Sequence, residues 1–177
     1  TLDEALRGSK APPHMLKDLV ILSIPHWGYD GKSHIGQLVV YVKAAREVKD
    51  IFTFLYKKKF PIFQMKPMVI FDWDDDASMA ANNSSAFNWR PIAGTRNLSL
   101  HSFGIAIDIN PLNNPYVSKA GKVSPPGAVY DTSHQGAIVE DGVVVQVFER
   151  RKWEWGHRFP HCTDTHHFQK LSLLRAA

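Results

Sequence analysis

The most regular hydrophobic pattern in the chain spans residues 44–58. Apolar residues there recur at helical spacing, while Arg46, Lys49 and Lys57 fall on the opposite side. The apolar positions are Ala44, Val48, Ile51, Phe52 and Leu55. This spacing predicts an amphipathic helix whose apolar stripe packs on the core. A shorter pattern of valines and Phe148 predicts a second helix from about Asp141 to Arg150.

Two β-type runs precede the first helix. Leu19 to Ile24 is rich in aliphatic residues and stops at Pro25, and Leu38 to Val42 repeats the pattern. These runs predict two strands that pair as a hairpin. The connection between them is long and contains His26 and His34, which we interpret as loop residues because neither has a partner at ligand spacing.

Two polar segments are expected to lack regular structure. Residues from Thr1 to Lys17 are polar and contain two adjacent prolines, so they predict an irregular arm. The acidic run from Asp72 to Asp76 predicts a solvated turn, in which Asp75 or Asp76 caps the segment that follows.

A strand pattern that contains a candidate metal ligand begins at Gly104. Isoleucines at positions 105, 107 and 109 alternate with Gly104, Ala106 and Asp108, which is the period of a β-strand. The isoleucine side suits the core, and the small residues on the other side leave space in front of the Asp108 carboxylate. His101 lies just before the strand. An imidazole and a carboxylate that converge on one side of a sheet are typical metal ligands.

A third ligand is expected near the end of the chain. Asp164 stands three residues before His167, a spacing that can place a carboxylate beside a metal-bound imidazole without making it a ligand. Three protein ligands and one open position are typical of a catalytic zinc site, and a free carboxylate beside them can act as general base. His166 is the main rival of His167. We expect His157 and His161 to be polar loop residues.

Both motifs resemble those of a known enzyme family. Ser99-x-His101-x-x-Gly104-x-Ala106-x-Asp108, followed by Asp164-x-x-His167-Phe168, is similar to the VanY-type zinc D-alanyl-D-alanine carboxypeptidases and L-alanyl-D-glutamate endopeptidases. These are cell-wall peptidases of bacteria and phages. The first motif is complete at all five fixed positions, and the resemblance extends from about residue 18 to residue 170.

The resemblance implies the roles of seven residues. The implied zinc ligands are His101, Asp108 and His167, which hold one zinc ion with a water in the fourth position. Asp164 would be the catalytic base, and Arg90 would support the oxyanion, a role that suits its permanent charge and fixed fork of donors. Ser99 and Trp155 are expected substrate contacts. The implied substrate is a peptidoglycan stem peptide, cut either at D-Ala-D-Ala or at L-Ala-D-Glu.

Two other functional classes remain as alternatives. One is a catalytically silent, metal-containing binding module of the same fold, as in the hedgehog signalling domain. The presence of Asp164 argues against it, because a binding module needs no base. The other is a zinc hydrolase of phosphoesters. It would favour a glycine-rich phosphate loop or a second cluster of metal-binding carboxylates, and the sequence contains neither.

Composition limits the partners, the disulfide bonds and the membrane segments that we expect for the protein. The formal net charge is +4, and Lys57-Lys-Lys59 has no aromatic or glycine interleaving, so we expect no nucleic-acid partner. The single cysteine, Cys162, excludes an internal disulfide and is expected to be an inert thiol. No apolar run has the length of a membrane span. We also expect no leader or anchor within this stretch, since its first residues are not a basic segment before an apolar block.

These observations define one expected architecture. We expect a single compact α+β domain over residues 18–177, preceded by the arm of residues 1–17. A mainly antiparallel sheet would carry the site on one face, with helices on the other, as in the hedgehog and D,D-peptidase folds. We expect a monomer, located outside the cytoplasm in the periplasm, in the cell wall or secreted.

Overall fold

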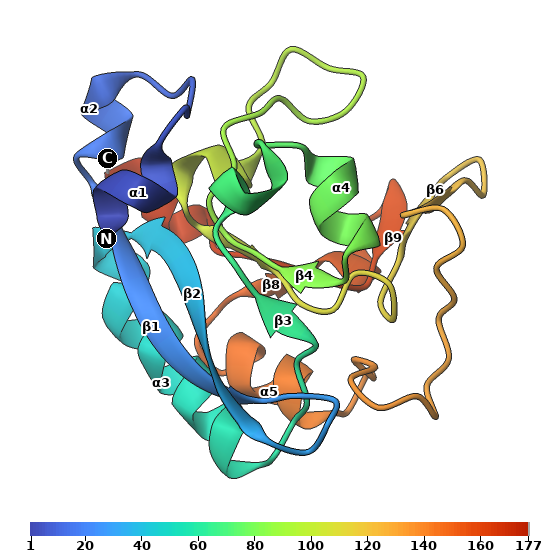
Figure 1. Cartoon of the computed structure of the whole chain (residues 1–177). Helices are drawn as coiled ribbons and strands as arrows, with labels where there is room; N and C mark the ends of the chain where they lie inside the picture. Colours follow the sequence, from blue (N-terminus) through green and yellow to red (C-terminus); the bar gives the residue numbers. More distant parts are fainter. Residues whose placement is uncertain (177) are drawn as a thin grey trace.

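A long β-hairpin and the helix that follows it form the framework of the molecule (Figure 1). In the computed structural model, which describes residues 1–176, β1 (Leu19–Trp27) pairs antiparallel with β2 (Ser33–Tyr41). Helix α3 (Ala45–Lys57) packs against β1 and buries the apolar stripe that the sequence predicts. The predicted first helix is therefore confirmed to within one residue at each end.

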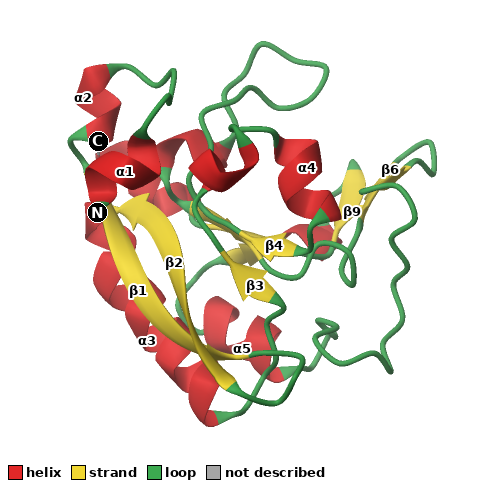
Figure 2. Ribbon diagram, in the orientation of Figure 1, coloured by secondary structure: helices red, strands yellow, loops and turns green. Residues whose placement is uncertain are grey.

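The remaining elements are short (Figure 2). The helices are α1 (Leu2–Leu6), α2 (Pro13–Leu16), α4 (Asp75–Ala80) and α5 (Val143–Glu149). The 3₁₀ segments are η1 (Val42–Ala44), η2 (Met68–Phe71), η3 (Leu100–Phe103), η4 (Gly156–Arg158) and η5 (Leu171–Ala176). The strands are β3 (Gln64–Met65), β4 (Asn83–Ser84), β5 (Ala106–Asp108), β6 (Tyr116–Ser118), β7 (Val123–Ser124), β8 (Glu154–Trp155), β9 (Cys162–Asp164) and β10 (His167–Gln169).

The described strands form four small sheets rather than the one sheet that the sequence led us to expect. Besides the β1–β2 hairpin there are the antiparallel sheets β5–β10–β8 and β7–β6–β9, and the parallel pair β3–β4. An isolated bridge between Ser85 and Asp108 joins the parallel pair to β5. The α+β class and the mainly antiparallel pairing are confirmed.

The core lies between the hairpin, α3, α5 and the sheet that contains β5. Ile105, Ile107 and Ile109 are almost completely buried there, so the predicted inward side of this strand is confirmed. Phe148 of α5 stacks on Phe168 of β10, with ring centroids 4.1 Å apart. Helix α5 is thus pressed against the strand that carries His167.

Two buried asparagines fix the chain where it leaves β5. The Asn110 amide donates to the carbonyls of Pro61 and Gly136, and its oxygen accepts from the Phe63 amide. Asn114 donates to the Gly136 carbonyl and accepts from the amide of Ile138. Because these side chains take the place of strand pairing, loops rather than long strands surround the site.

Three local predictions are wrong. Strand β1 continues through Pro25, which pairs with Ile35, and His26 and His34 lie opposite each other in the hairpin rather than in its loop. A proline is tolerated there because the hairpin is a two-stranded sheet whose strands are both edges. The cap of α4 is the neighbouring acid Asp74, whose side chain accepts from the Ala77 amide.

The third correction concerns the first residues. The segment expected to be an irregular arm contains α1 and α2, and Thr1 closes a capping box on α1 with Glu4. Ala5 and Ala11 pack in a second, smaller core with Leu19, Val39 and Phe87. The domain boundary at residue 17 stays a prediction. Within residues 1–176, no helix combines the length and the apolar character that crossing a bilayer requires.

Candidate active site

The first motif folds as a capped turn that leads into β5. Ser99 begins η3, and its hydroxyl accepts a hydrogen bond from the amide of His101 at 3.3 Å. Gly104 ends η3 with a φ of 65°, and a Cβ there would lie 2.6 Å from the Tyr41 nitrogen in β2. The fixed serine and glycine of the motif therefore shape the backbone, so that His101 and Asp108 point into one space.

The third candidate ligand comes from the neighbouring strand. In the antiparallel β5–β10 pair, His167 is directly opposite Asp108. Side chains at opposite positions of an antiparallel pair lie on the same face, with their Cβ atoms about 5 Å apart. His167 is 59 residues from Asp108 along the chain, so a distant segment places the second imidazole beside the Asp108 carboxylate.

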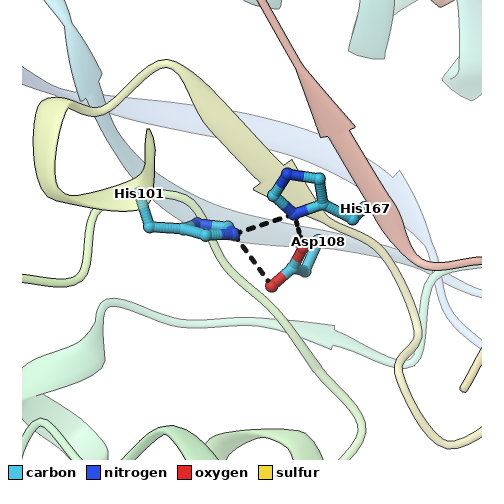
Figure 3. A group of neighbouring side chains, drawn as sticks. All are labelled: His101, Asp108 and His167. Atoms are coloured by element: carbon cyan, nitrogen blue, oxygen red, sulfur yellow. Dashed lines mark hydrogen bonds and ion pairs between the residues drawn. The ribbon is translucent and has the colours of Figure 1, made fainter. Parts of the chain in front are cut away.

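The three side chains meet at hydrogen-bonding distance (Figure 3). His101 Nε2 lies 3.1 Å from His167 Nδ1 and 3.1 Å from Asp108 Oδ2, and His167 Nδ1 lies 2.9 Å from Asp108 Oδ1. All three residues are buried. Ligands bound tetrahedrally at zinc distances stand roughly 3.3 Å apart, so these separations suit one shared ion.

Hydrogen bonds on the outer side of each ring assign the tautomers. His101 Nδ1 donates to the carbonyl of Ala86, which can only accept. His167 Nε2 donates to Gln169 Oε1 at 3.2 Å, and the Gln169 amide is oriented by its own bond to Glu154. Both inner nitrogens therefore present lone pairs to each other and to the Asp108 carboxylate. This donor set suits a cation, and two imidazoles with a carboxylate fit zinc.

The electrostatics of the cluster show that it attracts positive charge. Burial would raise the pKa of Asp108, but the charges of His101 and His166 hold that pKa well below its usual range. Burial would lower the pKa of His167, but its hydrogen bond and attraction to Asp108 raise it. A buried carboxylate that stays ionised favours any positive ion placed next to it.

Asp164 lies beside the cluster, at the end of β9. Its Oδ1 is 3.0 Å from His166 Nε2, and the same nitrogen is 3.9 Å from Asp108 Oδ1. On its other side, His166 Nδ1 donates to the Asn114 carbonyl at 2.7 Å. Burial lowers the pKa of His166, but Asp164 and Asp108 together raise it to about 10. In the described residues His166 is outside the group that could hold a metal, and it bridges the two carboxylates instead.

Gly156 is a residue of the site to which the sequence assigned no role. A Cβ at this position would lie 2.6 Å from the Asp164 carbonyl oxygen, 2.9 Å from Asp164 Cβ and 3.1 Å from His167 Cβ. The glycine therefore lets Asp164 and His167 approach each other. The signal available in the sequence was a glycine directly after two closely spaced tryptophans, Trp153 and Trp155.

Arg90 is anchored through its main chain to η3, the segment that carries His101. Its amide donates to Ser102 Oγ at 3.0 Å, and its carbonyl accepts from the Ser99 amide at 3.0 Å. Its guanidinium contacts Asp75, with Nη2 2.9 Å from Oδ2, rather than one of the three clustered side chains. The structure thus brings Arg90 next to η3 without a direct contact to His101, Asp108 or His167.

The two expected substrate contacts are both buried. The Trp155 side chain is inside, with its residue 3 % exposed, and its indole N–H donates to the Thr165 carbonyl at 2.9 Å. Its ring stacks on the more accessible His157, with centroids 4.6 Å apart. Ser99 is used as the cap of η3. Substrate contact by either residue stays a prediction, and the observed contacts are those of supporting residues.

The site is of the kind that holds one metal ion between two imidazoles and a carboxylate, inside an α+β domain. Residues 93–170 match the family model described as D-alanyl-D-alanine carboxypeptidase, which confirms the family predicted from the two motifs. The matched region contains the three clustered residues and Asp164, and the match supports peptidase chemistry in general terms. No curated protein and no solved structure matches the chain, so likeness to the hedgehog fold stays a prediction.

Proposed function

We propose that the protein is a zinc-dependent peptidase that hydrolyses the stem peptides of peptidoglycan. The observation that carries the proposal is the convergence of two imidazole lone pairs and the Asp108 carboxylate, with Asp164 beside them. The family match over the same residues supports peptidase chemistry. The proposal includes a single zinc ion and a monomer that works in the periplasm, in the cell wall or as a secreted protein.

In this proposal His101, Asp108 and His167 hold the ion. When bound, zinc supplies a Lewis acid for the scissile carbonyl and lowers the pKa of a coordinated water to roughly 7. The Asp164 carboxylate takes a proton from the attacking water as the new C–O bond forms, and it passes that proton to the leaving amine nitrogen as the C–N bond breaks. His166, 3.0 Å from Asp164 Oδ1, orients this carboxylate.

Arg90 has the complementary role in the proposal. Its guanidinium donates hydrogen bonds to the oxygen of the scissile carbonyl, on which negative charge develops during attack. Arginine suits this role because it stays charged at every physiological pH and presents several donors in one plane.

The proposal is tested with wild type, Asp164→Asn and His101→Ala, by measuring bound zinc and the cleavage of a synthetic stem pentapeptide. We expect one zinc per wild-type chain and product masses that distinguish loss of a terminal D-Ala from cleavage between L-Ala and D-Glu. Asp164→Asn should bind zinc normally and cleave about 10²- to 10⁴-fold more slowly, the range that a general base contributes. His101→Ala should lose zinc.

Two outcomes would contradict the proposal in different ways. If Asp164→Asn binds zinc and cleaves at the wild-type rate, Asp164 is not the base. If the wild-type protein binds zinc and the stem peptide but releases no product, the chain is the silent binding module that the sequence left as an alternative.

A further inference from the structure

An ion pair links α4 to Arg90, outside the metal cluster. Asp75 lies in the first turn of α4, and its Oδ2 is 2.9 Å from Arg90 Nη2. The other carboxylate oxygen of Asp75 accepts a hydrogen bond from the buried Asn88 amide at 3.1 Å. Each oxygen of the carboxylate therefore has a partner of its own, which fixes the plane of the Asp75 side chain.

Arg90 is held at both ends. Ser102 Oγ accepts from its main-chain amide at 3.0 Å and donates to its carbonyl at 2.9 Å, which attaches the backbone to the 3₁₀ segment that carries His101. The far end of the side chain is held by Asp75. The position of the guanidinium relative to His101 is thus set by two contacts, one of which is the Asp75 carboxylate.

The guanidinium still has donors for an anion. Its Nε is buried and has no hydrogen-bond partner among the described residues, and Nη1 makes only a long contact of 3.5 Å with the Pro91 carbonyl. An arginine carries five N–H donors, so the ion pair with Asp75 leaves most of them available. An arginine that is held in one orientation loses less freedom when it meets its target.

We propose that Asp75 is a positioning residue, which orients the Arg90 guanidinium so that its remaining donors face the developing oxyanion of the substrate. This inference rests on the proposed function. Asp75 itself touches no substrate. It is not needed to cap α4, because Asp74 does so through the Ala77 amide. The Asp75 and Arg90 side chains are each 27 % exposed, so water screens their ion pair and limits what it contributes to folding.

Kinetics of three single variants test the inference. Asp75→Asn keeps the shape of the side chain but removes its charge, and we expect kcat to fall about tenfold with KM changed less than twofold, because the lost interaction acts in the transition state. Asp75→Glu restores a carboxylate and should recover most of the activity. The control is Asp76→Asn, which removes an exposed acid from the same turn of α4 and should keep wild-type kcat. Thermal unfolding should be similar in all four proteins.

A double variant separates positioning from a general effect. We expect Asp75→Asn to cost nothing further in an Arg90→Ala background, because the group that it positions is absent. A wild-type kcat in Asp75→Asn overturns the inference. The inference is also overturned if Asp75→Asn lowers kcat by the same factor in the Arg90→Ala background as in wild type. Full activity of Arg90→Ala itself overturns it too. In each of these cases the loss of activity in Asp164→Asn can still be observed, so the proposed function stands. A wild-type protein that cleaves no stem peptide overturns both proposals.

Discussion

At the scale of single residues, Gly156 sets how close Asp164 can approach the cluster of His101, Asp108 and His167. Because a Cβ there would lie 2.6 Å from the Asp164 carbonyl oxygen and 3.1 Å from His167 Cβ, Gly156→Ala must shift the neighbouring chain, Asp164 most because its atoms are nearest. We expect zinc binding to persist and kcat to fall about 10²-fold, the effect of a misplacement near 1 Å. The control is Gly94→Ala, at a φ of 74° with nothing within 4 Å, which strains the backbone away from the site. Equal kcat values in the two variants would contradict the prediction.

His26 should make the stability of the protein depend on pH. Burial lowers its pKa, and the nearby His34 adds to the shift. A histidine whose folded pKa lies below the unfolded value of about 6.5 penalises folding when it is protonated, so stability falls as pH drops through that value. We expect metal-free wild type to lose more free energy of unfolding between pH 7.5 and pH 5 than metal-free His26→Asn does. Equal losses by urea denaturation would exclude His26 as the source.

The residues of the candidate metal site were predictable because residue types typical of metal ligands occur in two short motifs. His101, Asp108 and His167 stand at spacings that specify a turn followed by a strand, and the structure brings all three together. The ion pair of Asp75 with Arg90 was not predictable, since it joins segments whose relative position no local pattern encodes. The cap of α4 was missed by one residue, because three consecutive aspartates are equally good caps by residue type.

At the scale of elements, long periodic segments were predicted well and short strands were not. Helix α3 and the β1–β2 hairpin bury a regular apolar pattern that can be read directly. Strands such as β3 and β4 have two residues each, too few to show a period, and side-chain bonds from Asn83 to Lys66 hold them in place. Such strands depend on tertiary contacts rather than on their own sequence.

A half-buried ion pair should hold α3 against the end of β10, the strand that contains His167. Lys170 Nζ, just after β10, lies 2.6 Å from Glu47 Oε1, and the indole N–H of Trp153 donates to the same carboxylate. We expect Glu47→Ala to lower the free energy of unfolding by about 2 kcal/mol, less than for a fully buried pair because water reaches it. The matched control is Asp50→Ala, on the exposed side of α3, for which we expect a change below about 0.5 kcal/mol. Equal changes by chemical denaturation would contradict this role.

At the scale of the whole molecule, the sequence predicted the class of the fold but not its division into sheets. One α+β domain follows from length, apolar content and the mixture of periodicities. The division into four small sheets depends on loops that Asn110 and Asn114 hold from inside. The ligands consequently come from η3, β5 and β10, which makes the proposed ion a cross-link between distant parts of the chain.

Zinc should therefore stabilise the entire fold and not only the site. A ligand that binds the folded state alone adds about 2.7 kcal/mol at a free concentration of 100 Kd. In a chain of this size that corresponds to a rise in Tm of roughly 5–10 °C. We expect calorimetry of wild type and Asp164→Asn to show this rise when zinc is added to the metal-free protein, and His167→Ala to show none. A rise of equal size in His167→Ala would mean that zinc binds elsewhere. No rise in wild type would contradict the proposed ligand set, whatever the peptidase activity.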